Sequence, residues 1–183
     1  MTDVIKRPQP AAWLRDVIIR PVEERDLPAL EWEGAYAHFR RVYADVYQRA
    51  VAGRACLWLA EDAEGLALGQ LFVLLRSLTD ESLADGATRA FIHSFRVRPD
   101  FRRGGLGTWL LLHAEGDLSA RGFEQVSLHV ARDNADGIRF YARHGFQQVG
   151  SSDGSWSFED HEGRTRHMYE PSWRMRKSLL TRP

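Results

Sequence analysis

A glycine-rich stretch over residues 97–108 constrains this chain more than any other part of its sequence. It follows a β-branched and aromatic run over residues 90–97 and leads into an apolar run that begins at Trp109. This order predicts a strand, a tight turn and a helix. A helix N-terminus leaves four backbone N–H groups without a partner, and a polar or acidic side chain usually accepts from them. Here glycines occupy the cap positions, and the first acid inside the expected helix is Glu115.

Two arginines, Arg102 and Arg103, stand directly before this helix start. A positive charge at the positive end of the helix dipole is unfavourable by roughly 0.3–1 kcal/mol. A bound anion reverses that sign, and glycines let its oxygens approach the backbone. The sequence therefore predicts a phosphate site, with a glycine-rich turn carrying solvated arginines as the alternative. The dinucleotide fingerprint G-x-G-x-x-G is excluded because Leu110 replaces its third glycine, and no lysine follows a glycine as the P-loop requires.

The spacing that fits is R-x-x-G-x-G, formed by Arg102, Gly105 and Gly107, and it resembles the acetyl-CoA pyrophosphate loop of the GNAT superfamily of N-acetyltransferases. A second segment, residues 134–146, resembles the family's N-x-x-A-x-x-x-Y-x-x-x-G-F pattern with Gly137 in place of the alanine. The resemblance implies an α/β (α+β) fold. Its central sheet is expected to be mixed and largely antiparallel, with helices on both faces and a parallel strand pair around the acetyl-CoA loop.

The resemblance also implies which residues bind acetyl-CoA. Backbone N–H groups of residues 103–108 are expected on the pyrophosphate, and the main chain of Phe95 and Val97 and the Asn134 side chain on the pantetheine arm. Asn134 is equally explained as a helix cap. The expected cofactor-binding set is Phe95, Val97, Arg102, Arg103, Gly104, Gly105, Leu106, Gly107, Thr108 and Asn134.

Tyr141 is the candidate general acid, because in the resemblance it matches a tyrosine that faces the cofactor sulfur. A phenol with a pKa of about 10 can protonate a thiolate whose conjugate acid has a pKa of about 8.5. A core tyrosine with a purely structural role is the alternative.

The base that takes the proton of the attacking amine is not identified by the sequence. The candidates are His93 and Ser94 on the strand before the loop and Glu31 and Glu33 near the first helices, with a chain of waters as the alternative. If the two glutamates face the acceptor, their charge favours a cationic amine.

Composition excludes several other classes of function. With 25 basic and 25 acidic residues the chain has no net charge, so nucleic acid and anionic membranes are not expected partners. The seven histidines show no metal-ligand spacing, so no metal site is expected. Cys56 lies in an apolar run and is interpreted as an inert core thiol. No apolar run approaches the ~20 residues of a membrane span, and the start of the chain lacks a secretory signal, so a cytoplasmic protein is expected.

The pattern of elements predicts one domain over residues 1–183, with residues 1–12 as a flexible leader and residues 151–183 as a C-terminal hairpin and last strand. Asp26 is expected to cap a helix that begins near Leu27, and the aromatic residues between Trp32 and Tyr47 are expected on one helix face, interrupted at Gly34. Strands are expected over residues 16–20, 55–60, 66–75, 90–97, 125–130, 155–159, 165–170 and 173–177, with another beginning at residue 146, and helices over residues 105–121 and 134–145.

These observations favour an N-acetyltransferase that moves an acetyl group from acetyl-CoA to a primary amine by direct attack in a ternary complex. The acceptor is expected to be a small-molecule or peptide amine. A non-catalytic acyl-CoA-binding module is the alternative from a different class. Arg174, Arg176 and Lys177 are interpreted as a solvated strand face. Aromatic residues near them, Trp156, Phe158 and Trp173, leave a homodimer open.

Overall fold

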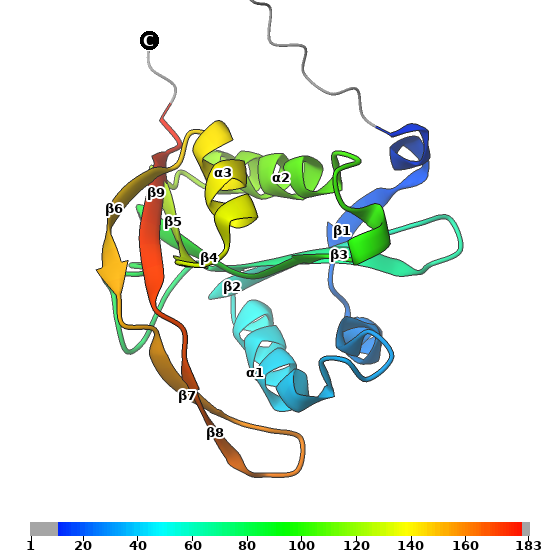
Figure 1. The fold of residues 1–183 in the computed structure, drawn as a ribbon, viewed down its shortest axis with the longest axis horizontal. Helices are drawn as coiled ribbons and strands as arrows, with labels where there is room; N and C mark the ends of the chain where they lie inside the picture. Colours follow the sequence, from blue (N-terminus) through cyan, green and yellow to red (C-terminus); the bar gives the residue numbers. More distant parts are fainter. Residues whose placement is uncertain (1–10, 181–183) are drawn as a thin grey trace, which may run out of the picture.

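A seven-stranded sheet forms the centre of the computed structural model, which describes residues 11–180 (Figure 1). Its strands follow the order β1-β2-β3-β4-β5-β9-β6. Within the described residues the β4–β5 pair is parallel and the other neighbouring pairs are antiparallel, as expected. The strands are β1 (Ile18–Pro21), β2 (Ala55–Glu61), β3 (Ala67–Leu74), β4 (Arg89–Val97), β5 (Gln125–Ala131), β6 (Gln147–Ser152) and β9 (Ser172–Ser178).

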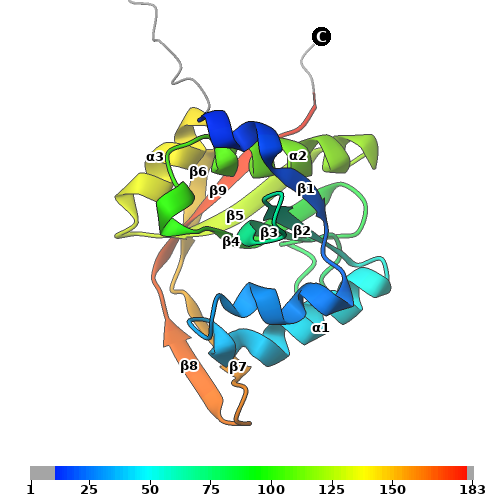
Figure 2. The ribbon, with the colours of Figure 1, turned by 90° about the vertical axis from the view of Figure 1, so that its right-hand side faces the viewer.

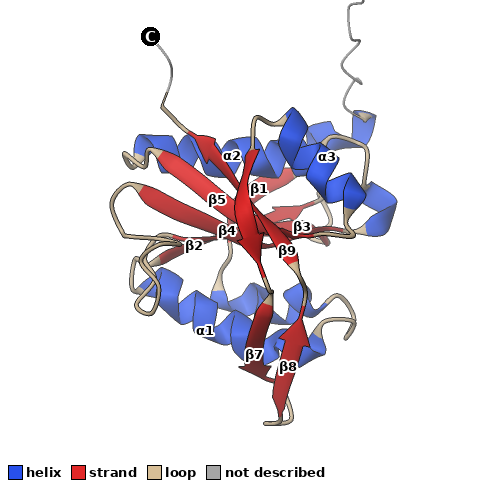
Figure 3. Ribbon diagram, turned by 60° about the vertical axis from the view of Figure 1, so that its left-hand side comes forward, coloured by secondary structure: helices blue, strands red, loops and turns tan. Residues whose placement is uncertain are grey.

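Helices cover both faces of this sheet (Figures 2 and 3). On one face lie α2 (Leu106–Ala120), α3 (Ala135–Arg143) and the short η1 (Ala12–Asp16). On the other face lie α1 (Arg40–Val51), η2 (Glu24–Glu31) and η3 (Ala37–Phe39). We call these the α2 face and the α1 face. The connection from β4 to β5 passes through α2, which is the helical crossover that a parallel pair requires.

The third strand, β3, shows why the sheet is central. All of its residues are buried, since it is covered on both faces. Leu71 and Val73 pack in the core under α2, whereas Ala67 and Phe72 pack in a second core against α1. Each fully buried side chain of this size contributes about 1.5–3 kcal/mol relative to exposure. A near-continuous apolar strand is typical of such a two-sided sheet.

A hairpin of β7 (Ser155–Glu159) and β8 (Thr165–Tyr169) forms a separate two-stranded sheet, as the sequence predicts. It is inserted between β6 and β9 and extends past the sheet on the side of α1 (Figure 2). Arg41 of α1 forms an ion pair with Glu159 of the hairpin. The Phe39 ring lies 6.2 Å from Trp156 and 4.9 Å from Phe158. The hairpin is therefore packed on the α1 face and does not stand apart from it.

Two local expectations are corrected around the first helices. Asp26 is not the cap: Glu23 is the N-cap residue of η2, and Asp26 accepts from the Glu23 backbone at the third position of a capping box. The aromatic residues from Trp32 to Tyr47 do not share one helix. Trp32 adopts φ 46°, Gly34 adopts φ 91°, and only the later aromatic residues lie on α1.

The start of the chain also differs in part from what the sequence predicts. The expected leader covers residues 1–12, of which 1–10 lie outside the described residues. Ala11 and Ala12 are part of the fold, because Ala12 begins η1 and the Ala11 N–H donates to the Gly104 carbonyl at 3.0 Å. The first strand extends through Pro21, which is tolerated because β1 is an edge strand with one neighbour.

Candidate functional site

The fourth strand contains a β-bulge that changes which side chains face each side of the sheet. Gln70 of β3 is paired with Arg96, and Phe72 is paired with His93, so one residue of β3 opposes both Ser94 and Phe95. Ser94 adopts φ 50°, which is uncommon for a residue other than glycine. An extra residue in one strand reverses the alternation beyond it.

This reversal separates the aromatic and charged residues of β4. Phe95 and Val97 pack with the core on the α2 face. Arg96 lies on the α1 face, where its guanidinium stacks on Tyr36. Simple alternation would have put Phe95 on the same face as His93, so the sequence did not reveal this arrangement.

The bulge lies where β4 and β5 separate. Their last registered pair is Ile92 with Leu128, although β4 continues to Val97 and β5 continues to Ala131. The two strands therefore separate at the carboxyl ends of a parallel pair, which is where α/β sheets commonly bind ligands. The predicted loop begins directly after β4.

The start of α2 has the features that the sequence predicts for an anion site. Gly105 is the N-cap residue with φ 101°, no side chain of residues 11–180 caps the helix, and its first turn contains no acid. The first backbone bond at this end is from the Trp109 N–H to the Gly105 carbonyl, at 3.0 Å. Within residues 11–180, the six N–H groups of residues 103–108 donate no hydrogen bond. Consecutive unpaired N–H groups at a helix N-terminus are a suitable site for a phosphate.

The two arginines of the loop differ in their contacts. The Arg102 Nε donates to the Val97 carbonyl at 2.9 Å, so this carbonyl, expected on the pantetheine arm, already accepts from a side chain. The Arg103 side chain is 89% exposed and lies 3.7 Å from Asp136 at the start of α3. Exposed pairs of this kind contribute little to stability, so Arg103 can turn to an anion at small cost.

Gly104 has a packing role that sequence reasoning missed. A Cβ at this position would lie 2.4 Å from the indole of Trp13 in η1. Trp13 also packs edge-on against Phe101, with ring centroids 5.2 Å apart. The segment that precedes β1 therefore holds the loop in place. The sequence signal was Trp13 itself, a large apolar residue next to a stretch that otherwise looked unstructured.

Tyr141 of α3 lies beside the bulge, on the α2 face. Its ring centroid is 6.3 Å from Phe95, 5.3 Å from Phe140 and 5.6 Å from Phe146. Desolvation by these neighbours raises the pKa of the Tyr141 phenol well above its ordinary value. The phenol therefore keeps its proton at neutral pH, as a general acid requires, and the same shift makes it a weaker acid toward a thiolate.

The second motif also contains structural contacts. The Asn134 Oδ1 accepts from the Gly137 N–H at 2.9 Å and caps α3. A Cβ on Gly137 would lie 2.7 Å from the Asn134 amide, which gives a packing reason for glycine at this position. The Thr108 hydroxyl lies 3.1 Å from the His144 Nε2, a contact that joins the start of α2 to the end of α3.

Neither glutamate proposed as a base is free to accept a proton. Glu31 receives two hydrogen bonds from Arg40, at 2.6 and 2.8 Å, and Glu33 receives two from Arg98, both at 2.8 Å. These arginines lower the pKa of both carboxyl groups. Because each charge is matched by a guanidinium, the two glutamates give the site no preference for a cationic amine.

His93 and Ser94 are close to one another at the bulge. The His93 Nδ1 lies 3.2 Å from the Ser94 hydroxyl. Burial, with a smaller effect of Arg49 and Arg96, lowers the pKa of His93 to about 4. His93 is thus neutral at pH 7 but a weak base, which favours water as the proton acceptor.

The remaining sequence-based interpretations have mixed outcomes. Burial raises the pKa of Cys56 to about 11, in agreement with an inert thiol. Lys177 is not solvated, because its ammonium donates to both oxygens of Glu115. Trp156 and Phe158 pack on their own chain, so they do not support a homodimer, which stays a prediction. No metal-ligating group of three or more residues is present over residues 11–180.

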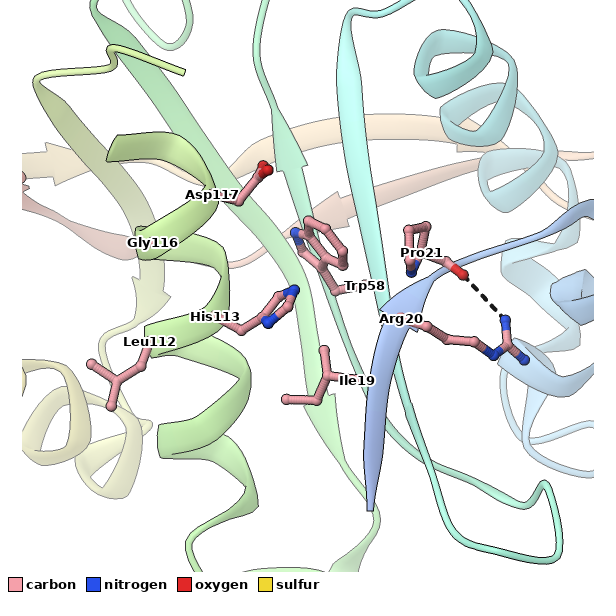
Figure 4. Close-up of a pocket in the computed structure, with 8 residues that line it drawn as sticks. All are labelled: Ile19, Arg20, Pro21, Trp58, Leu112, His113, Gly116 and Asp117. Atoms are coloured by element: carbon pink, nitrogen blue, oxygen red, sulfur yellow. Dashed lines mark hydrogen bonds between the residues drawn. The ribbon is translucent and has the colours of Figure 1, made fainter. Parts of the chain in front are cut away.

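Figure 4 shows a shallow groove between α2 and β1, away from the loop. Its walls include Ile19, Leu112, and His113, whose ring is 4.4 Å from that of Trp58. None of the predicted site residues lines it. Among the helices of residues 11–180, none is long and apolar enough to span a bilayer.

Sequence comparison identifies the class of protein that this fold and site define. Residues 9–146 match the model of the acetyltransferase (GNAT) family, and the chain belongs to that family. The matched region includes the loop and the segment that contains Tyr141. It ends before the hairpin and the last strand.

Two characterised relatives share part of the chain. A mycothiol acetyltransferase of Saccharomonospora viridis is 36% identical over 92 residues, which are 50% of this chain and 30% of the relative. A ribosomal protein bS18-alanine N-acetyltransferase of Salmonella typhimurium is 33% identical over 87 residues, which are 44% of this chain and 59% of the relative. The matches thus span less than two thirds of either relative.

The fold is also similar to that of a solved acetyltransferase. The structure of the PaiA N-acetyltransferase of Thermoplasma acidophilum, in complex with coenzyme A, has a TM-score of 0.64 and 19% identity. The similarity covers 88% of this chain and 98% of that chain. It supports the fold assigned above.

Proposed function

We propose that this protein is an N-acetyltransferase that transfers an acetyl group from acetyl-CoA to a primary amine by direct attack in a ternary complex. The observation that carries the proposal is the row of unpaired N–H groups over residues 103–108, directly after a bulged strand. Family membership supports the same reaction class. The co-substrate supplies a thioester whose acetyl group can pass to a nucleophile.

The residues present fit this co-substrate. The backbone of the loop, including Gly105 and Gly107, would hold the diphosphate, with Arg102 and Arg103 adding charge-assisted contacts. Phe95 and Tyr141 would line the arm that carries the thioester, and the main chain released by the bulge would lie near its carbonyl. One N–H aimed at the oxygen on which charge develops can lower the barrier by about 3–4 kcal/mol.

The bonds and protons of the proposed reaction are all accounted for without a charged base. The neutral amine nitrogen forms a bond to the carbonyl carbon, the carbon–sulfur bond breaks, and the Tyr141 hydroxyl gives its proton to the departing thiolate. The proton of the amine passes to water, because Glu31, Glu33 and His93 are poor acceptors here. The phenol is then reprotonated from solvent.

The absence of a free carboxylate base in the described site keeps the non-catalytic acyl-CoA-binding module as a second candidate. Two measurements separate the candidates. Coenzyme A is expected to raise the thermal midpoint of the protein in both cases, since ligand binding stabilises the folded state. Thiol release from acetyl-CoA with a panel of primary amines is expected only for the enzyme. Binding of coenzyme A without release for any amine would establish the module instead.

A further inference from the structure

Arg96 is a guanidinium on the α1 face of the sheet with no carboxylate beside it. Its Cζ lies 4.2 Å from the Tyr36 ring centroid and 5.1 Å from that of Phe39, and its Nη1 donates to the Tyr43 hydroxyl at 2.5 Å. Within residues 11–180, no Asp or Glu oxygen lies within ion-pair distance of it. Aromatic faces fix the plane of such a group but do not neutralise its charge.

The acids around this region are already paired with other arginines. Glu31 is bound by Arg40, and Glu33 is bound by Arg98. The Asp160 carboxylate at the hairpin turn is fully buried and bound by Arg166 at 2.7 Å. The carboxylates of this region are therefore neutralised, and Arg96 supplies positive charge to the side from which an acceptor would reach the bulge.

A buried amide beside Arg96 also has unused hydrogen-bonding groups. Gln70 is opposite Arg96 across the β3–β4 pair, so both side chains lie on the α1 face. Gln70 is 0% exposed and lies beside the Tyr43 hydroxyl, yet within residues 11–180 neither atom of its amide group has a well-formed hydrogen bond. A buried polar group left unpaired costs about 1–3 kcal/mol, so a ligand group that completes a hydrogen bond to this amide would be stabilised.

Aromatic residues from the hairpin close this region on one side. Trp156 stacks on Phe39 at 6.2 Å with an interplanar angle of 16°, and Phe39 in turn lies against Arg96. Trp156 is itself 41% exposed, so the wall is open to solvent at its rim. A guanidinium with a planar fork, held among aromatic rings, is well suited to a carboxylate.

We propose that Arg96, assisted by the amide of Gln70, binds a carboxylate of the acceptor, so that the substrate is an amine that also bears a carboxylate, as an amino acid does. This inference rests on the proposed function and specifies its acceptor. The bulge explains the geometry, since it places Arg96 one residue beyond the point where the thioester is expected, and on the opposite face from Phe95. A polycationic amine would meet like charge here.

The test uses pairs of amines that differ only in the carboxylate. Alanine, leucine, methionine and phenylalanine are each compared with their carboxamides, and spermidine is the polycationic probe. At a given pH the amide offers more neutral amine, so a preference for the acid does not come from amine protonation. Wild type is expected to favour the acid at least tenfold in kcat/KM. Arg96→Met is expected to reduce that ratio below threefold, and Arg96→Lys is expected to fall between the two.

Matched variants separate charge recognition from folding. Arg25→Met removes an exposed arginine that is paired with Glu23, and it is expected to keep the wild-type ratio. Tyr43→Phe keeps the ring and removes the hydroxyl that accepts from Arg96. It therefore tests the contribution of the Arg96 guanidinium if Arg96→Met does not fold. A coenzyme A-induced thermal shift equal to that of wild type shows that the α2 face is intact. An acid-to-amide ratio near one in wild type, or an unchanged ratio in folded Arg96→Met, would overturn the proposal.

A binding measurement distinguishes this inference from the proposed function. Calorimetry on the coenzyme A-loaded protein measures acceptor binding without turnover. Arg96-dependent binding of the acids with no thiol release would support the inference and refute acetyl transfer. Acetylation of amides and spermidine as fast as of the acids would support transfer and refute the inference. If no amine is bound or acetylated, both are refuted.

Discussion

The two proposed ligand sites, one on each face of the sheet, would recognise their ligands by different means. On the α2 face the expected contacts come from the backbone: unpaired N–H groups over residues 103–108 follow one strand and begin one helix. On the α1 face the contacts come from the side chains of Tyr36, Gln70, Arg96 and Trp156, which lie on four separate segments. A backbone site needs a few glycines at fixed spacing, whereas a side-chain site needs the whole fold to bring its members together.

The largest expected effect tests the backbone site. Gly105→Ala puts a methyl group beside the N–H cluster and strains a residue at φ 101°. We expect coenzyme A affinity to fall about 30-fold, which corresponds to the loss of one or two charge-assisted hydrogen bonds. Isothermal titration calorimetry measures this affinity.

The control for Gly105→Ala lies at the other end of α2. Gly122 has φ 87°, and no neighbouring atom lies within 4 Å of the position that a Cβ would take, so Gly122→Ala introduces the same kind of backbone strain far from the cluster. Both variants are expected to lose about 1–2 kcal/mol of stability, but only Gly105→Ala should lose affinity. Equal affinity in the two variants would show that the N–H groups do not bind the co-substrate.

A smaller effect is expected at Tyr141, which lies beside the bulge on the α2 face. Tyr141→Phe removes the phenol proton while the ring keeps its packing, so turnover should fall at least about tenfold with unchanged coenzyme A affinity. Steady-state thiol release measures turnover. Tyr169→Phe, at a tyrosine that is 71% exposed, is the control and should leave turnover unchanged. Normal turnover in Tyr141→Phe would remove Tyr141 from the mechanism.

The last expected effect concerns stability, and not binding or turnover, on the α1 face. The pKa of His93 is about 4 in the folded chain against an ordinary value of 6.5, so between these pH values the unfolded chain binds a proton that the folded chain does not. Stability therefore falls as pH falls through this window. Wild type is expected to lose about 2 kcal/mol more than His93→Gln over that range.

Urea unfolding at a series of pH values measures this difference. His161→Gln, at an exposed histidine of the hairpin turn, should keep the wild-type pH dependence. The activity of His93→Gln at pH 7 should stay within threefold of wild type, because so weak a base is a poor acceptor for the proton of the amine. A large loss of activity would make His93 a participant in proton transfer.

The same contrast explains how much the sequence could predict. The strand before the loop, the uncapped helix and the Asn134 cap depend on local spacing, and all of them are present. The largely antiparallel sheet was implied by the resemblance to the family, and it is present too. The aromatic residues after Trp32 follow a helical spacing, and the expected interruption at Gly34 is present, where the backbone adopts φ 91°. The sequence did not predict that only the later aromatic residues would lie on α1.

The acceptor side was less predictable for a physical reason. The role proposed for Arg96 depends on a one-residue bulge, and a single inserted residue moves every later side chain to the other face. Glu33 looked free in the sequence because Arg98, its partner, lies 65 positions away. Contacts of this kind require the tertiary structure.

The insertion of the β7–β8 hairpin between β6 and β9 places one side of the proposed acceptor site on a segment separate from the loop before α2. The family match ends at residue 146, before the hairpin begins, yet the hairpin's aromatic residues reach the α1 face. Under the proposed function, replacing this hairpin would change the aromatic side of the acceptor site and leave the loop before α2 unchanged. We therefore expect a grafted hairpin to alter the preference for acceptors without a change in coenzyme A affinity.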